Sequence, residues 1–114
     1  MKVSVIHRAF EKSSRLVAFV DVPDTMPVEE ALEYAFERTQ NLRGSWSREA
    51  EFEFGGEVIG NGDFSEDVTV MADLPINKRT GQVMGLRSTS VGDRLIYGNT
   101  CFRVDDFGFE KEVA

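Results

Sequence analysis

The alternation of apolar and polar side chains predicts β-strands at the start of the chain. Two strand-like runs, Lys2–Phe10 and Leu16–Val22, are separated by a short polar segment and are expected to pair as a hairpin. Leu16–Val20 is apolar at successive positions, which is typical of an internal strand covered by a helix on at least one face. The pattern therefore predicts a sheet that begins at the N-terminus.

A second predicted hairpin lies in the middle of the chain. Glu51–Phe54 alternates strictly, and Gly55-Gly56 separates it from the strand-like Glu57–Ile59. Phe52 and Phe54 are expected to point inward. Another strand is expected over Asp67–Met71.

The strongest local signal is near the C-terminus. The stretch Arg87–Asp93 leads into the strand-like Arg94–Tyr97, the turn pair Gly98-Asn99 and the strand-like Thr100–Phe109. These runs are rich in β-branched and aromatic residues, and glycine tolerates positive φ, so one hairpin is predicted here. Leu74–Leu86 lacks periodicity and is expected to be a mobile loop.

One helix is predicted, over Pro27–Gln40. Thr25 can act as its N-cap, and Pro27 suits the first turn, where its missing N–H is harmless. Apolar side chains recur with the spacing of a single buried stripe: Val28, Ala31, Leu32, Ala35 and Phe36. A helix with one apolar stripe is expected to pack on the sheet. The predicted fold is one α+β domain over residues 1–114, with an antiparallel sheet of about five to seven strands.

The C-terminal hairpin is similar to a pattern found in small proteins of bacteriophages, plasmids and actinobacterial genomes. That pattern runs S-x-S-V-G-D, two short strands and F-G-F, and a YodL-like domain of mobile-element proteins ends in a similar way. The matching residues here are Arg87, Ser88, Ser90, Val91, Gly92, Asp93, Phe107, Gly108 and Phe109. The likeness extends to Thr39–Ser47 and Asn61–Asp63. It implies a small accessory protein of a mobile element and carries no activity residue by residue.

Composition narrows the class of protein. Apolar residues make up 41% of the 114, which suffices for one core. No apolar run approaches the roughly 18 residues of a membrane span, and Val3–Ile6 is too short for the core of a signal peptide. A cytoplasmic location is therefore expected. The single Cys101 cannot form an internal disulfide and is expected to be a core or near-core side chain.

Charge is unevenly distributed along the chain, with a formal net charge of −7. Residues 21–66 contain twelve acidic and three basic side chains. On the outer face of the predicted helix, Glu29, Glu33 and Glu37 form a like-charged ridge. Such a surface attracts basic partners and repels nucleic acid, although excess carboxylates also serve solubility alone.

Known catalytic and metal-binding patterns are incomplete. Asn61 begins a calcium-loop register, but Glu66 occupies the place of the required glycine and Ala72 that of the bidentate glutamate. His7 is the only histidine, so neither a zinc site nor a Cys–His pair has its usual partners. The glycine-rich stretches match no phosphate-binding fingerprint. We expect no metal, no cofactor and no enzyme activity.

Two binding functions are weighed ahead of an enzyme with an unrecognised carboxylate site. The first is a non-enzymatic accessory protein that binds a partner with a basic surface, such as a host defence or nucleic-acid-processing factor. Its candidate contacts are Glu29, Glu33, Glu37, Trp46, Glu51 and Glu53. The second is a nucleic-acid-associated module that uses the basic C-terminal part. Its candidate contacts are Lys78, Arg79, Arg87 and Arg94. Trp46 lies in a polar loop and either folds back over the core or faces a partner.

Overall fold

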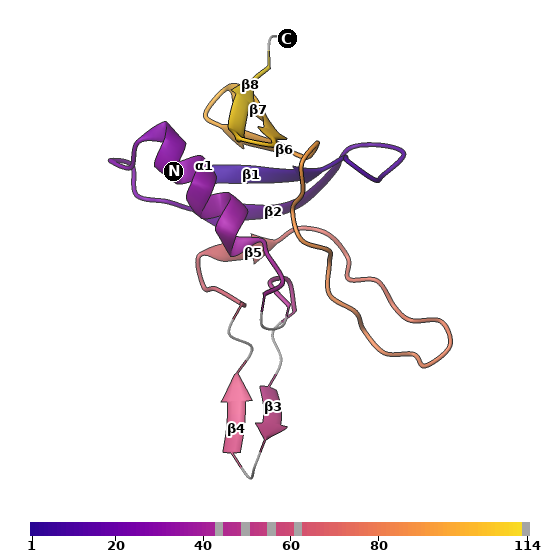
Figure 1. Cartoon of the computed structure of the whole chain (residues 1–114). Coiled ribbons are helices and arrows are strands. Elements are labelled where there is room, and N and C mark those ends of the chain that lie inside the picture. Colours follow the sequence, from indigo (N-terminus) through magenta and orange to yellow (C-terminus); the bar gives the residue numbers. More distant parts are fainter. Residues whose placement is uncertain (43–44, 49–50, 55–56, 61–62, 113–114) are drawn as a thin grey trace.

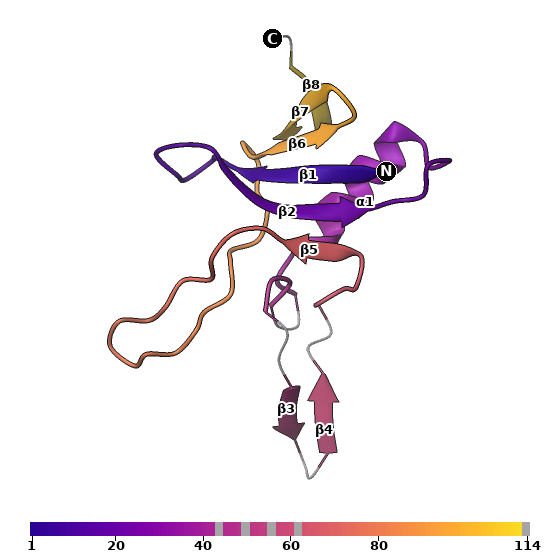
Figure 2. The same ribbon diagram turned by 180° about the vertical axis from the view of Figure 1, so that it is seen from behind.

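The computed structural model describes residues 1–42, 45–48, 51–54, 57–60 and 63–112. It forms a six-stranded antiparallel sheet in the order β5-β2-β1-β6-β7-β8, with helix α1 on one face, and a separate pair β3-β4 (Figures 1 and 2). The elements are β1 (Lys2–His7), β2 (Arg15–Asp21), α1 (Val28–Arg38), β3 (Glu51–Phe54), β4 (Glu57–Gly60), β5 (Val68–Val70), β6 (Arg94–Tyr97), β7 (Thr100–Asp105) and β8 (Gly108–Lys111). The predicted α+β class with one helix is confirmed.

The core lies between α1 and the sheet face that it covers. In the register of the three central strands, Val5 stands between Ala18 and Leu95, and all three are completely buried. One layer along, Val3 is opposite Val20 and is also completely buried. The predicted N-terminal hairpin is therefore confirmed, and both of its strands are internal to the sheet as the apolar Leu16–Val20 run indicated.

Helix α1 buries the middle of the predicted stripe and leaves its first residue in solvent. Ala31, Leu32 and Ala35 are buried, and Phe36 packs against them at the edge of the core. Val28 is 41% exposed because it occupies the first position of the helix, beyond the sheet. The predicted Thr25 cap is wrong: Pro27 occupies the N-cap position and no side chain caps the helix.

The C-terminal segment forms two hairpins, β6–β7 and β7–β8, where the sequence predicted one. The first turn, Gly98-Asn99, joins β6 to β7, with Gly98 at φ +61° as expected. The second turn, Asp106-Phe107, was missed because the aromatic Phe107 resembles a strand residue. Gly108 follows at φ +92°, a backbone angle that favours glycine. The chain reverses there, and the added strand β8 forms one edge of the sheet.

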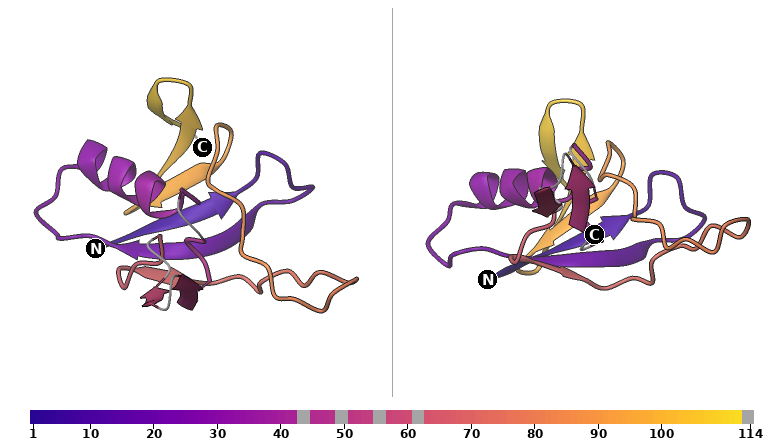
Figure 3. Two further views of the ribbon diagram at one scale, coloured as in Figure 1. Left: turned by 60° about the horizontal axis from the view of Figure 1, so that its bottom comes forward. Right: turned by 90° about the horizontal axis from the view of Figure 1, so that it is seen from below.

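Two excursions leave the body of the domain. The β3–β4 pair projects from the end of the molecule opposite the β7–β8 turn (Figures 1 and 3). Its antiparallel pairing is confirmed, whereas residues 55–56 and the side chains of Phe52 and Phe54 lie outside the described part of the structure. The segment between β5 and β6 extends sideways as a long loop (Figure 1). An isolated antiparallel β-bridge between Ile76 and Val83 holds its two sides together. None of the described helices is long and apolar enough to cross a membrane.

Candidate functional site

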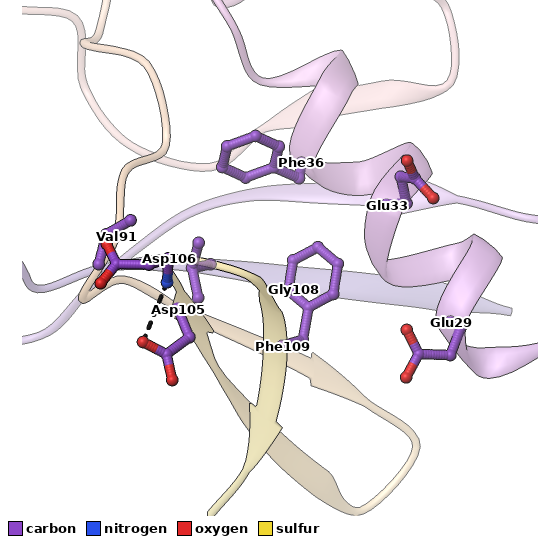
Figure 4. A pocket seen from close by; sticks show the side chains of 9 residues that line it. Glu29, Glu33, Phe36, Val91, Asp105, Asp106, Gly108 and Phe109 are labelled. Carbon is purple, nitrogen blue, oxygen red and sulfur yellow. Dashed lines mark hydrogen bonds between the residues drawn. The ribbon is translucent and has the colours of Figure 1, made fainter.

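A pocket opens between helix α1 and the β7–β8 hairpin (Figure 4). Its volume is about 340 Å³, near the lower end of the range of ligand pockets, about 300–1,000 Å³. The residues that line it come from three parts of the fold: Glu29, Glu33, Phe36, Val91, Val104, Asp105, Asp106, Gly108 and Phe109. No basic side chain is among them. The helix and the hairpin, far apart in the sequence, thus form one concave surface.

Aromatic and aliphatic side chains form the floor of this pocket. The rings of Phe36 and Phe109 meet edge to face, with centroids 6.2 Å apart and an interplanar angle of 69°. Phe109 is held there because the β7–β8 register places it opposite Val104, which is 3% exposed. Val91 lies at one side and is half exposed. The floor is therefore a fixed apolar surface open to solvent.

Carboxylates stand on two sides of the floor. Glu29 and Glu33 lie on the α1 side and Asp106 on the turn side (Figure 4). Within the described residues, no cation pairs with any of these three side chains. Asp105 differs, because its carboxylate is 3.4 Å from the Arg103 guanidinium and accepts the Asp106 N–H at 3.0 Å. That backbone hydrogen bond is the main reason why the pKa of Asp105 is lowered.

The turn that bounds the pocket carries the most exposed large apolar side chain of the described residues. Phe107 is 100% exposed, directly after Asp106 and before Gly108. An apolar ring held fully in water contributes nothing to the core of this chain. Exposed aromatic side chains are typical of protein contact surfaces. Sequence reasoning missed Asp106, Phe107 and Phe109 as site residues, because the second turn was not predicted.

The Arg87–Asp93 motif forms a second cluster, which is buried. The carboxylate of Asp93 is completely buried and accepts the backbone N–H groups of Arg8, Ala9 and Ser90 at 2.8–2.9 Å. It also binds the Arg87 guanidinium through two contacts, at 2.7 and 2.8 Å. Burial raises the pKa of Asp93, but these donors outweigh it and bring the pKa to about 2. Asp93 therefore joins the end of β1 to the start of β6.

Arg87 extends the cluster to the loop between β1 and β2. Its guanidinium donates to both Glu11 oxygens, at 2.7 and 3.1 Å, and stacks over the Phe10 ring. The backbone oxygen of Arg87 accepts the Trp46 indole N–H at 2.8 Å. The Arg87–Asp93 motif thus fastens three segments of this chain together.

His7 lies within this cluster without the geometry of a catalytic triad. Its Nε2 is 3.0 Å from Thr89 Oγ1 and 4.0 Å from Asp93, so both side chains approach the same nitrogen. A triad needs the acid on the opposite ring nitrogen. His7 and Thr89 are each 2% exposed, and burial, followed by the charge of Arg87, lowers the pKa of His7. This trio is arranged as part of the core.

The predicted partner contacts fall in different places. Glu29 and Glu33 line the pocket, and Glu37 lies on the same helix outside the pocket lining. Trp46 is completely buried against His7, so it folds back over the core and is no partner contact here. Glu51 and Glu53 belong to β3, whose hairpin projects from the far end of the molecule. Only the backbone of β3 is described, and the side chains of Glu51 and Glu53 lie outside the described part of the structure.

The predicted basic contacts are not brought together either. Lys78 and Arg79 are exposed in the turn of the long loop between β5 and β6. Arg87 is engaged by Glu11 and Asp93, and Arg94 pairs with Glu112. Two of the four candidate cations therefore already have carboxylate partners.

The remaining chemical candidates have structural roles in the described residues. No group of three or more potential metal ligands occurs among them. Asp63 accepts the backbone N–H of Leu42, and Asp67 accepts the Tyr34 hydroxyl, whereas Asn61 lies outside the described part of the structure. Burial, with the nearby Glu112, raises the pKa of Cys101, which disfavours a reactive thiolate.

Comparisons with protein-family models, with curated proteins and with solved structures find no match for this chain.

Proposed function

We propose that this chain is a non-enzymatic accessory protein, of the mobile-element type that its C-terminal motif resembles, and that it binds another protein through an acidic surface. The contact surface is the pocket between α1 and the β7–β8 turn. The observation that supports this most is the presence of Glu29, Glu33 and Asp106 around an open apolar floor, with no cation lining it. A partner with a basic, partly apolar surface is the complement of such a site.

The unpaired carboxylates of the pocket indicate what kind of partner would bind there. Carboxylates that serve only solubility need no shared concave surface, whereas these lie on two separate elements around Phe36 and Phe109. Phe107 adds an exposed apolar contact next to them. Complementary charges would steer the partner, and burial of the aromatic rings would contribute to affinity. A bound protein could cover both features at once.

The alternative function, binding of nucleic acid through the basic C-terminal part, has less support. Among the described residues, Lys78 and Arg79 are the two candidate cations that form no ion pair, and both lie on one loop far from the pocket. Two lysine or arginine side chains provide a weak electrostatic contact with a polyphosphate, and a net charge of −7 opposes it. The experiment below separates the two functions.

The test is affinity capture from the source cells, with immobilised wild-type chain and charge-reversal variants. E29K/E33K reverses the pocket-lining pair, and E66K/D73K makes the same change in charge at exposed positions beside β5. Bound proteins are identified and measured in lysate treated with nuclease. We expect a protein that is retained by wild type and by E66K/D73K, and is lost with E29K/E33K and at high salt.

Two results would contradict the proposal. Equal retention by E29K/E33K and wild type would show that the pocket surface is not the contact. Capture that disappears on nuclease treatment, and that Lys78→Ala and Arg79→Ala weaken, would favour the nucleic-acid alternative instead.

A further inference from the structure

We infer that the pocket receives one arginine side chain from an exposed segment of the partner. This inference rests on the proposed function and specifies which residue the site recognises. The pocket holds about 340 Å³, near the lower end of the range of ligand pockets, so it can admit one long side chain but is too small for a folded element. The partner segment would cross the opening between α1 and the β7–β8 turn, and its arginine would enter.

The aromatic floor of the pocket can bind a flat cation by stacking. Phe36 and Phe109 form an edge-to-face pair, so two ring surfaces line the same small volume. A guanidinium group stacks on aromatic rings, and its three-carbon stem is apolar. This fold already contains such a contact at another place, where the Arg87 guanidinium lies 4.9 Å from the Phe10 ring centroid. The pocket offers the aromatic part of the contact with no cation of its own.

The rim suits the same group. Glu29 and Glu33 lie on the α1 side of the rings and Asp106 lies on the turn side, beside Val91, so carboxylates flank the apolar floor on two sides (Figure 4). Arginine carries five N–H donors in a planar fork, whereas lysine is a compact charge that stays more strongly hydrated. A site with aromatic faces and separated carboxylates therefore favours arginine over lysine.

Charge complementarity also excludes other occupants. Within the described residues, the three rim carboxylates have no partner, so an acidic or phosphorylated segment would meet uncompensated repulsion. A purely apolar side chain would cover the rings and leave those carboxylates partly desolvated, which costs free energy. An arginine brings an apolar stem and a flat cation to the aromatic floor, and its charge is complementary to the carboxylates around it.

The test is an NMR titration of the uniformly ¹⁵N-labelled full chain with three short blocked peptides, Gly-Arg-Gly, Gly-Lys-Gly and Gly-citrulline-Gly. Citrulline keeps the shape of arginine and removes its charge. We expect the arginine peptide to bind with a Kd of about 1–10 mM and to shift the amide signals of Glu33, Asp106 and Phe109. The lysine peptide should bind at least about threefold more weakly, and the citrulline peptide should cause no saturable shift.

Matched variants show whether the pocket carries the effect. E33Q removes a rim charge, and we expect it to weaken binding of the arginine peptide about threefold. E37Q removes the same charge from the same helix outside the pocket lining, and binding should stay within about 1.5-fold of wild type. Both positions are exposed, so neither change should disturb the fold.

Equal binding of arginine and citrulline peptides, tighter binding of lysine, equal effects of E33Q and E37Q, or shifts confined to other residues would each overturn the inference. Failure of the proposed function is a separate result. If capture from lysate still depends on Glu29 and Glu33 while the peptides show no arginine preference, the surface binds its partner without an arginine in the pocket. If E29K/E33K leaves capture unchanged, the proposed function itself is wrong.

Discussion

The guanidinium of Arg87 binds both carboxylate oxygens of the buried Asp93, with contacts of 2.7 and 2.8 Å. Asp93 is completely buried, whereas the Arg87 side chain is 27% exposed and reaches Glu11 on its other side. The carboxylate also accepts three backbone N–H groups, so its charge is satisfied from several directions. This pair fastens the loop after β1 to the start of β6, and Asp93 comes two residues after Val91 of the pocket lining.

Removing the Asp93 charge should strongly destabilise the fold. Asp93→Asn leaves Arg87 without its main partner and replaces an acceptor of several N–H groups by an amide. Breaking a buried ion pair costs about 3–5 kcal/mol. Urea unfolding followed by circular dichroism measures the loss. The matched control is Glu110→Gln, which breaks the exposed pair with Arg103 and should cost less than about 1 kcal/mol. Equal effects of both substitutions would refute the central role of Asp93.

Stability should fall with acidity in two steps. The pKa of His7 is lowered below 6.5 in the folded chain. Below pH 6.5 the unfolded chain therefore binds a proton at this histidine more readily than the folded chain does, and the free energy of unfolding decreases as the pH falls. The pKa of Asp93 is lowered from 3.8 to about 2, so its contribution of about 2 kcal/mol is present above pH 4 and is lost between pH 4 and 2.

Unfolding free energies between pH 8 and 2 measure both steps. In His7→Gln the first step should disappear, whatever the loss of stability at pH 8, because glutamine does not titrate. A wild-type stability that stays constant between pH 7 and 5 would show that His7 is protonated with equal ease in both states.

Substitutions along the apolar stripe of α1 should differ in how much they lower the free energy of unfolding. Leu32 is 1% exposed, and Leu32→Ala should cost about 2–5 kcal/mol, because it leaves a cavity between α1 and the sheet. Val28→Ala should change stability by no more than about 0.5 kcal/mol, because Val28 is 41% exposed. Thermal melting of the two variants tests this directly. Similar shifts of the two melting temperatures would contradict the packing of α1.

A side chain at Gly92 should be costly. Gly92 has φ +96°, its N–H donates to the Val104 oxygen, and a Cβ there would lie 3.2 Å from the Cβ of Ala9. Gly98 also has positive φ, but a Cβ there meets nothing within 4 Å. Both alanine variants carry backbone strain of about 1–2 kcal/mol, and Gly92→Ala should lose measurably more because of the contact. Unfolding curves in which Gly98→Ala is the less stable variant would disprove this ranking.

Most of the strands and the helix could be predicted from the sequence, because an element that is buried on one face has apolar residues at regular intervals. Ala31, Leu32 and Ala35 follow the helical period and are buried. The unbroken apolar run Leu16–Val20 indicated an internal strand instead, and Val17, Ala18 and Val20 of that run are buried. The edge strand β8 was not separated from β7, because its turn consists of Asp106 and the strand-forming Phe107. Turn residues with ordinary negative φ leave only a weak local signal, and Gly108 was the one indication.

The candidate site was predicted in part. The spacing of Glu29 and Glu33 on a helix was visible, since periodicity places them on the polar face. Asp106, which lines the other side of the pocket, comes from the C-terminal part of the chain, and only tertiary packing brings it close to α1. The role of Arg87 was hidden for the same reason: its partner Glu11 lies 76 residues away. A charge in a sequence does not show which opposite charge will meet it.

Photo-crosslinking from the pocket turn tests most directly whether this surface binds a protein. Photoreactive benzoylphenylalanine replaces Phe107, which is 100% exposed beside the pocket, or Ile76, which is 62% exposed on the distant loop. After irradiation in the source cells, we predict that the Phe107 position crosslinks to one protein at a segment containing arginine, and that the Ile76 position does not. Crosslinks to nucleic acid, or the same products from both positions, would contradict the account.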